Sequence, residues 1–319
     1  MKTNEIQIRD PYIYVHRQEP GYYLFGTTDK NCWNGLGVGF DCYQSFDLIN
    51  WEGPIAAFRP KPGFWATHNF WAPEVHFFKG RYYLLASFIA QRRFRGTQIF
   101  VADRIIGPYQ PLTDGPITPE NWQCLDGTLH IDADGKPWIV FCQEWVQVHD
   151  GSMWAMPLTE DLTRPMGRPI FLFNASEASW AYRSGWHGMG QPSQLPPYLS
   201  VPDLKSSFDY PLYVTDGPFL HQIENGALSM IWSSLGHEGY TMGVAYSESG
   251  KVTGPWKQSE DAIWTKDGGH GMIFRDLEGK LKVSLHQPND TPNERAIFVE
   301  IDETGSTVRL KSNGQEIVR

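Results

Sequence analysis

One short pattern recurs five times along this chain: an apolar stretch, a tight turn that contains glycine, and a second apolar or aromatic stretch. The glycines of these turns are Gly21, Gly80, Gly135, Gly226 and Gly279. Asp-Gly and Asn-Gly turns, which occur at 134–135 and 225–226, are strong hairpin signals because these residues tolerate positive φ. Another strand pair follows each hairpin, so each repeat supplies about four short strands, the content of one propeller blade.

Five repeats predict an all-β fold, a five-bladed β-propeller that forms a single domain over residues 1–319. An irregular β-sandwich is the alternative arrangement of so many short strands. The step from Gly135 to Gly226 is longer than the other steps, and it predicts a long loop insertion at about residues 173–209. Aromatic residues make up 14% of the chain, and this fraction favours short strands over long helices.

Charge and hydropathy exclude two classes of partner. The chain has 27 Lys and Arg against 36 Asp and Glu, a formal net charge of −9, so it lacks the basic surface that neutralises nucleic-acid phosphates. No apolar run approaches the roughly 18 residues of a membrane helix. We therefore expect neither a nucleic acid nor a membrane as partner, and the sequence carries no signal for an oligomeric state.

The N-terminus and the cysteines predict a cytoplasmic protein. Residues 1–6 contain no apolar stretch like that of a signal peptide. Cys32, Cys42, Cys124 and Cys142 have no C-x-x-C spacing and are sparse for a disulfide-stabilised secreted protein. We expect reduced, buried thiols. A secreted protein trimmed of its leader is the alternative.

One position stands out when the repeats are aligned on their turns. Asp10, Ala72, Asp126, Asp216 and His270 lie eight to eleven residues before the turn glycines. In a propeller this position begins the innermost strand of each blade, which lines the central axis. Three carboxylates and one imidazole are therefore predicted to converge at one end of the channel. Unpaired carboxylates there would repel one another and lose solvation, so a functional site explains them better than three separate turns do.

These segments resemble glycoside hydrolase family 43 over nearly the whole chain. The matching segments are Arg9-Asp10-Pro11, Trp71-Ala72-Pro73-Glu74, Asp126, Thr215-Asp216-Gly217-Pro218 and Gly269-His270-Gly271, in order and in register with the repeat. The resemblance implies an inverting hydrolase of glycans that contain arabinose, xylose or galactose, with an oligosaccharide or a polysaccharide side chain as substrate. Such an enzyme needs one protonated and one ionised carboxyl group about 6.5–9.5 Å apart.

The resemblance also implies catalytic roles. Asp10 would be the general base that activates water, and Asp126 would raise the pKa of the general acid and orient it. Asp216 lies where the family has a glutamate as general acid. Because aspartate is one methylene shorter, its carboxyl group would lie about 1.5 Å further back. Glu144, at the end of the second strand of the third blade, is the alternative acid.

Five more residues are candidates for binding sugar, each with a structural alternative. Phe70 and Trp71 would stack on a sugar ring, or would pack between blades. Gln143 and Trp145 would shape the sugar pocket, or would pack at the end of a strand. Arg295 lies where the family often has a sugar-binding arginine, or is a surface charge.

The resemblance places His270 beside a hydrated structural calcium ion in the central channel. The alternative for a lone histidine is a hydrogen-bonded residue of the core. No cofactor is required for the predicted chemistry.

The predicted activity is that of an exo-acting α-L-arabinofuranosidase on arabinose-containing oligosaccharides. The loop insertion at 173–209 would close one end of the cleft into a pocket, which favours release of single terminal sugars. A β-xylosidase or an exo-galactanase of the same family is the alternative, although the single-domain length leaves no room for the C-terminal sandwich of many β-xylosidases. A non-catalytic carbohydrate-binding propeller is the alternative of another class, motivated by the shortened acid Asp216.

Overall fold

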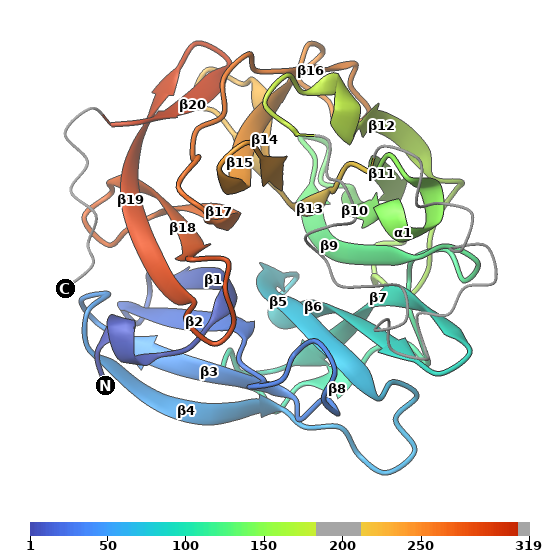
Figure 1. Cartoon of the computed structure of the whole chain (residues 1–319). Coiled ribbons are helices and arrows are strands. Elements are labelled where there is room, and N and C mark those ends of the chain that lie inside the picture. The colour runs from blue at the N-terminus through green and yellow to red at the C-terminus, as the bar shows by residue number, and fades with distance from the viewer. Residues whose placement is uncertain (183–211, 312–319) are drawn as a thin grey trace.

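The innermost strands of five antiparallel sheets surround a central axis in the computed structural model, which describes residues 1–182 and 212–311 (Figure 1). Each sheet has four strands, hydrogen-bonded to one another in sequence order, and its first strand lies nearest the axis. The chain is therefore a five-bladed β-propeller, as the repeat predicts. Within the described residues no helix has the length and apolar character needed to cross a membrane.

The five blades follow one another along the chain. Blade 1 contains β1 (Arg9–His16), β2 (Gly21–Thr27), β3 (Phe40–Ser45) and β4 (Trp51–Phe58). Blade 2 contains β5 (His68–Phe78), β6 (Arg81–Ala90), β7 (Arg93–Ala102) and β8 (Gln110–Pro111). Blade 3 contains β9 (Cys124–Ile131), β10 (Pro137–Gln143), β11 (Ser152–Pro157) and β12 (Ile170–Asn174). Blade 4 contains β13 (Asp216–Gln222), β14 (Leu228–Gly236), β15 (Gly239–Ser247) and β16 (Trp256–Gln258). Blade 5 contains β17 (Gly269–Arg275), β18 (Leu281–Gln287), β19 (Arg295–Thr304) and β20 (Thr307–Leu310).

The described helices are short: η1 (Thr3–Glu5), α1 (Trp145–Val148) and η2 (Ala175–Glu177). Of the predicted insertion at 173–209, the described part contains the end of β12 and η2, and residues 183–209 lie outside the described residues. All four cysteines are buried and unpaired, as predicted.

Aromatic side chains fill the space between the first two blades. Phe58 of blade 1 and Phe100 of blade 2 have ring centroids 4.6 Å apart, and Phe70 lies 4.9 Å from Phe88. Phe70 is only 2% exposed, so its ring stabilises the contact between blades and has no face for a sugar. The prediction that Phe70 stacks on substrate is therefore wrong.

Every innermost strand begins with the same irregularity, a bulge. One residue there has φ between 49° and 55°, just after the first paired residue in blades 1, 4 and 5 and just after the second in blades 2 and 3, and the pairing with the second strand shifts at it. These left-handed residues are Asp10, Ala72, Asp126, Gly217 and His270. A bulge of this kind removes one residue from the ladder and redirects its side chain.

The N–H of each left-handed residue donates a hydrogen bond across to the preceding blade. Its own sheet provides no partner, and a buried N–H needs one. The acceptor lies on the second strand of that blade in four of five cases: Thr27 Oγ1 for Ala72 (2.8 Å), Ser87 Oγ for Asp126 (2.7 Å), Ser233 Oγ for His270 (2.8 Å) and His286 Nδ1 for Asp10 (3.2 Å). In blade 4, the Gly217 N–H donates instead to Asp126 Oδ2 at 3.1 Å. These bonds link all five blades around the axis.

The first and last blades close the ring without sharing a strand. Ser284 Oγ of β18 donates to the Pro11 carbonyl of β1 at 2.6 Å. Arg295 Nε donates to the Asn4 carbonyl at 2.8 Å, and its Nη1 donates to the carbonyls of Pro292 and Glu294. Arg295 therefore holds the N-terminal segment against β19, which contradicts its predicted contact with sugar.

The inter-blade hydrogen bonds predict a stability difference between two adjacent serines of β14. Ser233→Ala should lower the free energy of unfolding by about 1–3 kcal/mol, because the buried His270 N–H loses its acceptor. Ser234 is equally buried, but its hydroxyl has no hydrogen-bond partner among the described residues. Ser234→Ala should therefore be neutral or slightly stabilising. Urea denaturation of both variants measures the difference, and equal losses would contradict the role given to Ser233.

Candidate active site

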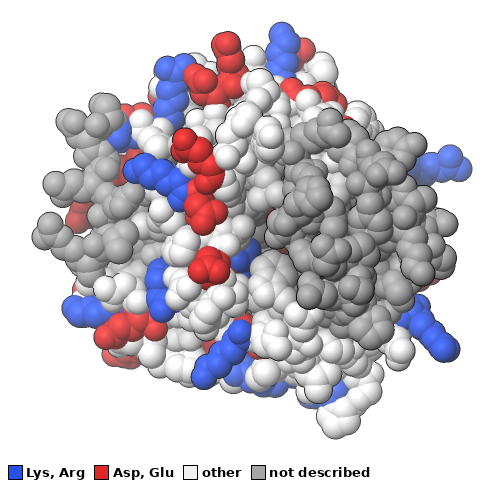
Figure 2. All heavy atoms as spheres, in the orientation of Figure 1, with Lys and Arg blue, Asp and Glu red and all other residues white. Residues whose placement is uncertain are grey.

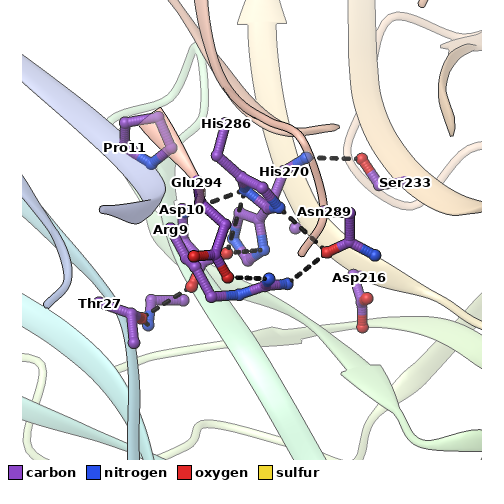
Figure 3. A network of polar contacts seen from close by, with 12 residues as sticks. Arg9, Asp10, Pro11, Thr27, Asp216, Ser233, His270, His286, Asn289 and Glu294 are labelled. Carbon is purple, nitrogen blue, oxygen red and sulfur yellow. Dashed lines mark hydrogen bonds and ion pairs between the residues drawn. The ribbon is translucent and has the colours of Figure 1, made fainter. Parts of the chain in front are cut away.

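The starts of β1, β9, β13 and β17 bring Asp10, Asp126, Asp216 and His270 together at one end of the axis. Figure 3 shows the network around Asp10 and His270, with Asp216 to one side of it. Asp10, Asp126 and His270 are buried, whereas Asp216 is partly exposed. The three predicted catalytic aspartates thus lie in one cluster.

Asp10 is held as an anion by three neighbours. His270 Nδ1 lies 3.1 Å from its Oδ1, and the Thr27 hydroxyl donates to its Oδ2 at 2.7 Å. Burial alone would raise the pKa of Asp10, but the charges of His270 and Arg9 and the Thr27 hydrogen bond lower it below its usual value. An ionised carboxylate of this kind can accept a proton from water.

His270 lies between two carboxylates. Its Nδ1 is 3.1 Å from Asp10 Oδ1 and 3.7 Å from Asp126 Oδ2. Burial would lower its pKa, but the charges of Asp10, Asp126 and Asp216 raise it, so the imidazolium form is favoured. The blade-4 backbone passes directly over this ring, because a Cβ on Gly217 would lie 2.7 Å from it.

Asp126 is buried and faces blade 4. Its Oδ2 accepts the Gly217 N–H at 3.1 Å. Burial and the charges of Asp216 and Asp10 raise the pKa of Asp126, and the opposing effects of His270 and Gly217 do not cancel this rise. Asp126 therefore contacts the backbone next to Asp216 and influences the charges of its neighbours.

Asp216 lies one residue away from the position predicted for it. Because the left-handed residue of blade 4 is Gly217, Asp216 corresponds in strand register to Arg9 and Trp71. Its Oδ2 accepts a hydrogen bond from the Tyr240 hydroxyl at 3.0 Å. Burial, together with the charges of Glu144 and Asp10, raises its pKa despite His270 and Tyr240. Asp216 thus combines partial exposure with a favoured protonated form.

Glu144, the alternative acid, is fixed in an ion pair. Its Oε2 lies 2.9 Å from Arg95 Nε, and both side chains are buried. Arg95 also lies over the Trp71 ring, 4.1 Å from its centroid, and its Nη1 donates to Asn69 Oδ1 at 3.1 Å. Glu144 is thus held by Arg95, and its charge raises the pKa of Asp216.

The remaining predicted residues lie at the edge of the cluster. Trp71 is partly exposed, and its Nε1 donates to the Cys32 carbonyl at 2.7 Å. Gln143 is buried at the end of β10, where its Nε2 donates to Gln147 Oε1 at 3.1 Å. Trp145 is partly exposed at the start of α1. Their contact with sugar stays a prediction.

A second polar layer was not predicted from the sequence. Arg9 Nη1 lies 2.8 Å from Glu294 Oε1, and its Nη2 donates to Asn289 Oδ1 at 2.7 Å (Figure 3). Burial and the Arg9 charge lower the pKa of His286 to about 3, so His286 is neutral and its Nδ1 can accept the Asp10 N–H. Arg9 could have been identified from the sequence, because it directly precedes the predicted base in Arg9-Asp10-Pro11.

The described residues do not fit a directly coordinated metal ion. They contain no group of three His, Cys, Asp or Glu side chains arranged to hold one. The His270 Nδ1 lies 3.1 Å from Asp10 Oδ1, and the hydrated calcium ion predicted beside this imidazole stays a prediction.

Comparison with known proteins gives one family match along the chain. The sequence pattern described as Glycosyl hydrolases family 43 matches residues 4–303. The crystal structure of an endo-arabinase from Bacteroides thetaiotaomicron VPI-5482 superposes with a TM-score of 0.83 at 36% identity, covering 96% of this chain and 98% of that one.

Two curated relatives match over shorter stretches. The extracellular exo-α-(1→5)-L-arabinofuranosidase ArbA of Cellvibrio japonicus (strain Ueda107) is 27% identical over 179 residues, 51% of this chain and 47% of that protein. The extracellular endo-α-(1→5)-L-arabinanase 1 of Bacillus subtilis (strain 168) is 25% identical over 133 residues, 37% of this chain and 41% of that protein. The chain thus spans less than half the length of either curated relative.

The raised pKa of Asp216 predicts a pH-dependent gain in stability for Asp216→Asn. A carboxyl group whose pKa is higher in the folded than in the unfolded state destabilises the fold as the pH rises above its unfolded value, about 3.9. The melting temperature of the variant relative to wild type should therefore increase from about pH 4 upward and level off above the pKa of Asp216 in the folded protein, which is about 6.

The exposed Asp114→Asn is the matched control, because it removes a carboxylate outside the cluster. Its difference from wild type should not follow this curve. A pH-independent effect of Asp216→Asn would show that Asp216 is not held at a raised pKa.

Proposed function

Because the chain belongs to glycosyl hydrolases family 43 and is therefore a glycoside hydrolase, we propose that it cleaves arabinan, the α-1,5-linked polymer of arabinose, with inversion at the anomeric carbon. The observation that carries the proposal is a cluster of carboxyl groups on neighbouring blades in which the surroundings lower the pKa of Asp10 and raise that of Asp216 to about 6. Inverting hydrolysis needs one base and one acid of this kind.

The substrate class is supported by similarity and by surface charge. The endo-arabinase that resembles this chain over nearly its whole length is the relative with the highest identity reported above. On the part of the face that Figure 2 draws for described residues, acidic and basic side chains lie interspersed. An uncharged polysaccharide fits such a surface better than a polyanion does.

In the proposed reaction, water approaches the anomeric carbon from the side of Asp10. Asp10 accepts a proton from this water as the water oxygen forms its bond to the carbon. On the opposite face, Asp216 donates its proton to the glycosidic oxygen as the bond between that oxygen and the carbon breaks. The products are a sugar of inverted configuration and a free hydroxyl, with Asp10 protonated and Asp216 ionised. Proton exchange with solvent restores both groups.

Asp126 and Glu144 assist without touching the reacting atoms. Asp126 fixes the Gly217 N–H, and so holds the backbone next to Asp216. Glu144 raises the pKa of Asp216 through its negative charge, which its ion pair with Arg95 maintains. These contacts support Asp216 as the acid and Glu144 as its neighbour.

The mode of attack is a finer proposal. Exo-action, predicted from the sequence, agrees with the name of the Cellvibrio relative, whereas the Bacteroides and Bacillus relatives are named as endo-acting. Products of linear arabinan separate the two modes. Arabinose alone from the first minutes indicates exo-action, and a series of oligosaccharides with a rapid fall in viscosity indicates endo-action.

Asp10→Asn should reduce arabinan turnover by about three or more orders of magnitude, because no other group can take the proton from the attacking water. Proton NMR of the newly released reducing end should show the inverted anomer first with the wild-type protein. Retained configuration would rule out the inverting mechanism. A different outcome is that the wild-type protein binds arabino-oligosaccharides but hydrolyses neither them nor aryl arabinofuranosides, xylosides and galactosides. This result would favour a carbohydrate-binding propeller.

Asp216→Asn and Glu144→Gln should differ in their dependence on the leaving group. An acid matters most when the departing oxygen is strongly basic. Asp216→Asn should therefore abolish cleavage of arabino-oligosaccharides while retaining much of the activity on an activated aryl arabinofuranoside. Glu144→Gln should depend much less on the leaving group, because Asp216 is still present and loses only one of the charges that raise its pKa. The reverse pattern would make Glu144 the acid.

A further inference from the structure

We propose that Trp33, in the loop between β2 and β3, is a sugar-binding platform that takes an arabinose unit beyond the two joined by the cleaved bond. This inference rests on the proposed function and deepens it. Trp33 was not among the residues predicted from the sequence to bind sugar.

Trp33 lies against two residues of the active site. Its ring centroid is 5.2 Å from that of Trp71 in an edge-to-face arrangement, and the Arg9 guanidinium carbon lies 4.8 Å from the same Trp33 ring. Trp33 remains 42% exposed despite these contacts. Part of a large apolar ring is therefore open to solvent at the edge of the catalytic cluster.

The position of these two neighbours sets where a ligand on Trp33 would lie. Arg9 precedes the left-handed Asp10 in β1, and Trp71 precedes the left-handed Ala72 in β5. Arg9 and Trp71 thus each lie one residue before the left-handed position, which is the position that directs Asp10 toward the axis. Trp33 contacts both residues and is more exposed than either of them, so we infer that it lies further from the reacting carbon than they do. A sugar on it would neighbour the reacting pair of sugars.

The platform is rigid before any ligand arrives. Trp33 Nε1 donates to Thr291 Oγ1 at 3.0 Å, which links the loop to blade 5. The buried Asn69 donates from Nδ2 to the carbonyls of Cys32 and Trp33 at 2.9 and 3.0 Å, and Trp71 Nε1 donates to the Cys32 carbonyl as well. An aromatic ring fixed in this way loses little conformational freedom on binding.

The chemistry of the surface fits a neutral sugar chain. Leu36 and Val38 of the same loop are 70% and 60% exposed, so Trp33 is one of three exposed apolar residues in a segment of the loop. A furanose ring presents C–H groups on one face and hydroxyls at its edge. The C–H face can cover the apolar indole, while the hydroxyls remain in water. Arabinan is such a ligand, and it brings no charge to be desolvated beside Arg9.

The test compares chain lengths. Two substrates are compared. The long one is arabinohexaose, and the short one is the shortest arabino-oligosaccharide, from arabinobiose upward, that the wild-type protein cleaves. Trp33→Ala should lower kcat/KM for arabinohexaose by about tenfold, mainly through KM, because an exposed aromatic anchor contributes binding energy that long substrates alone can use. For the short substrate, kcat/KM should change by less than about twofold.

Phe77→Ala is the matched control, because Phe77 is 52% exposed near the other end of β5. It should leave both substrates unaffected. Trp33→Phe keeps an aromatic face and should restore most of the loss for arabinohexaose, which also guards against a folding defect in the alanine variant.

Equal losses on both substrates would overturn the inference, because they would mean that Trp33 only supports Trp71 and Arg9. An unchanged KM for arabinohexaose would overturn it as well. Either result leaves the proposed function intact, since the wild-type protein still cleaves arabinan. Failure of the wild-type protein to cleave any of these oligosaccharides would instead refute the proposed function, and the inference with it.

Discussion

The hydrogen bond that each left-handed residue donates to its neighbouring blade is the contact on which the site depends. The bulge that begins every innermost strand leaves one N–H without a partner in its own sheet, and the cost of burying it unpaired is avoided only when the next blade approaches closely. Blade packing and side-chain direction are therefore set by the same bond. Asp10, Asp126 and His270 point to one place because their backbones make equivalent bonds.

Blade 4 departs from this arrangement, and the departure has a chemical cause. The acceptor position for each left-handed N–H lies on the second strand of the preceding blade, opposite the residue just before that blade's own left-handed residue. In four blades this position holds Thr27, Ser87, Ser233 or His286, but in blade 3, which precedes blade 4, it holds Cys142. A thiol is a weak acceptor, so the Gly217 N–H bonds to the Asp126 carboxylate instead. This direct bond connects the backbone beside Asp216 to Asp126. Two carboxyl groups from different blades are thereby held in a fixed relation without touching each other.

The sequence was sufficient for the fold and for the identity of the clustered aspartates, because hairpin turns and strand starts are local signals. The register of blade 4 was predicted one residue too early. Pro or Gly follows the left-handed residue in every blade, but Asp216 is followed by Gly217 and Gly217 by Pro218, so this local pattern fits both residues and could not fix the register. Arg95 and Trp33 could not be predicted, since their partners lie in other strands and loops. Arg295 and Phe70 were wrong for the same reason: their three-dimensional neighbours decide whether they face the ligand.

The different roles proposed for Asp10 as base and Asp216 as acid follow from the charges that the fold places beside each of them. Arg9, His270 and the Thr27 hydroxyl lie around Asp10 and stabilise its negative charge. Glu144 lies near Asp216 and destabilises a negative charge there. A protonated His270 opposes this at Asp216, yet burial and Glu144 outweigh it. Because Arg95 holds Glu144 in place, one of the charges that raise the pKa of Asp216 depends on an ion pair whose two members are both buried. Loss of Arg95 would leave the buried Glu144 without this partner and free to leave its place near Asp216. The acid therefore depends on Arg95, a residue outside the group of carboxylates.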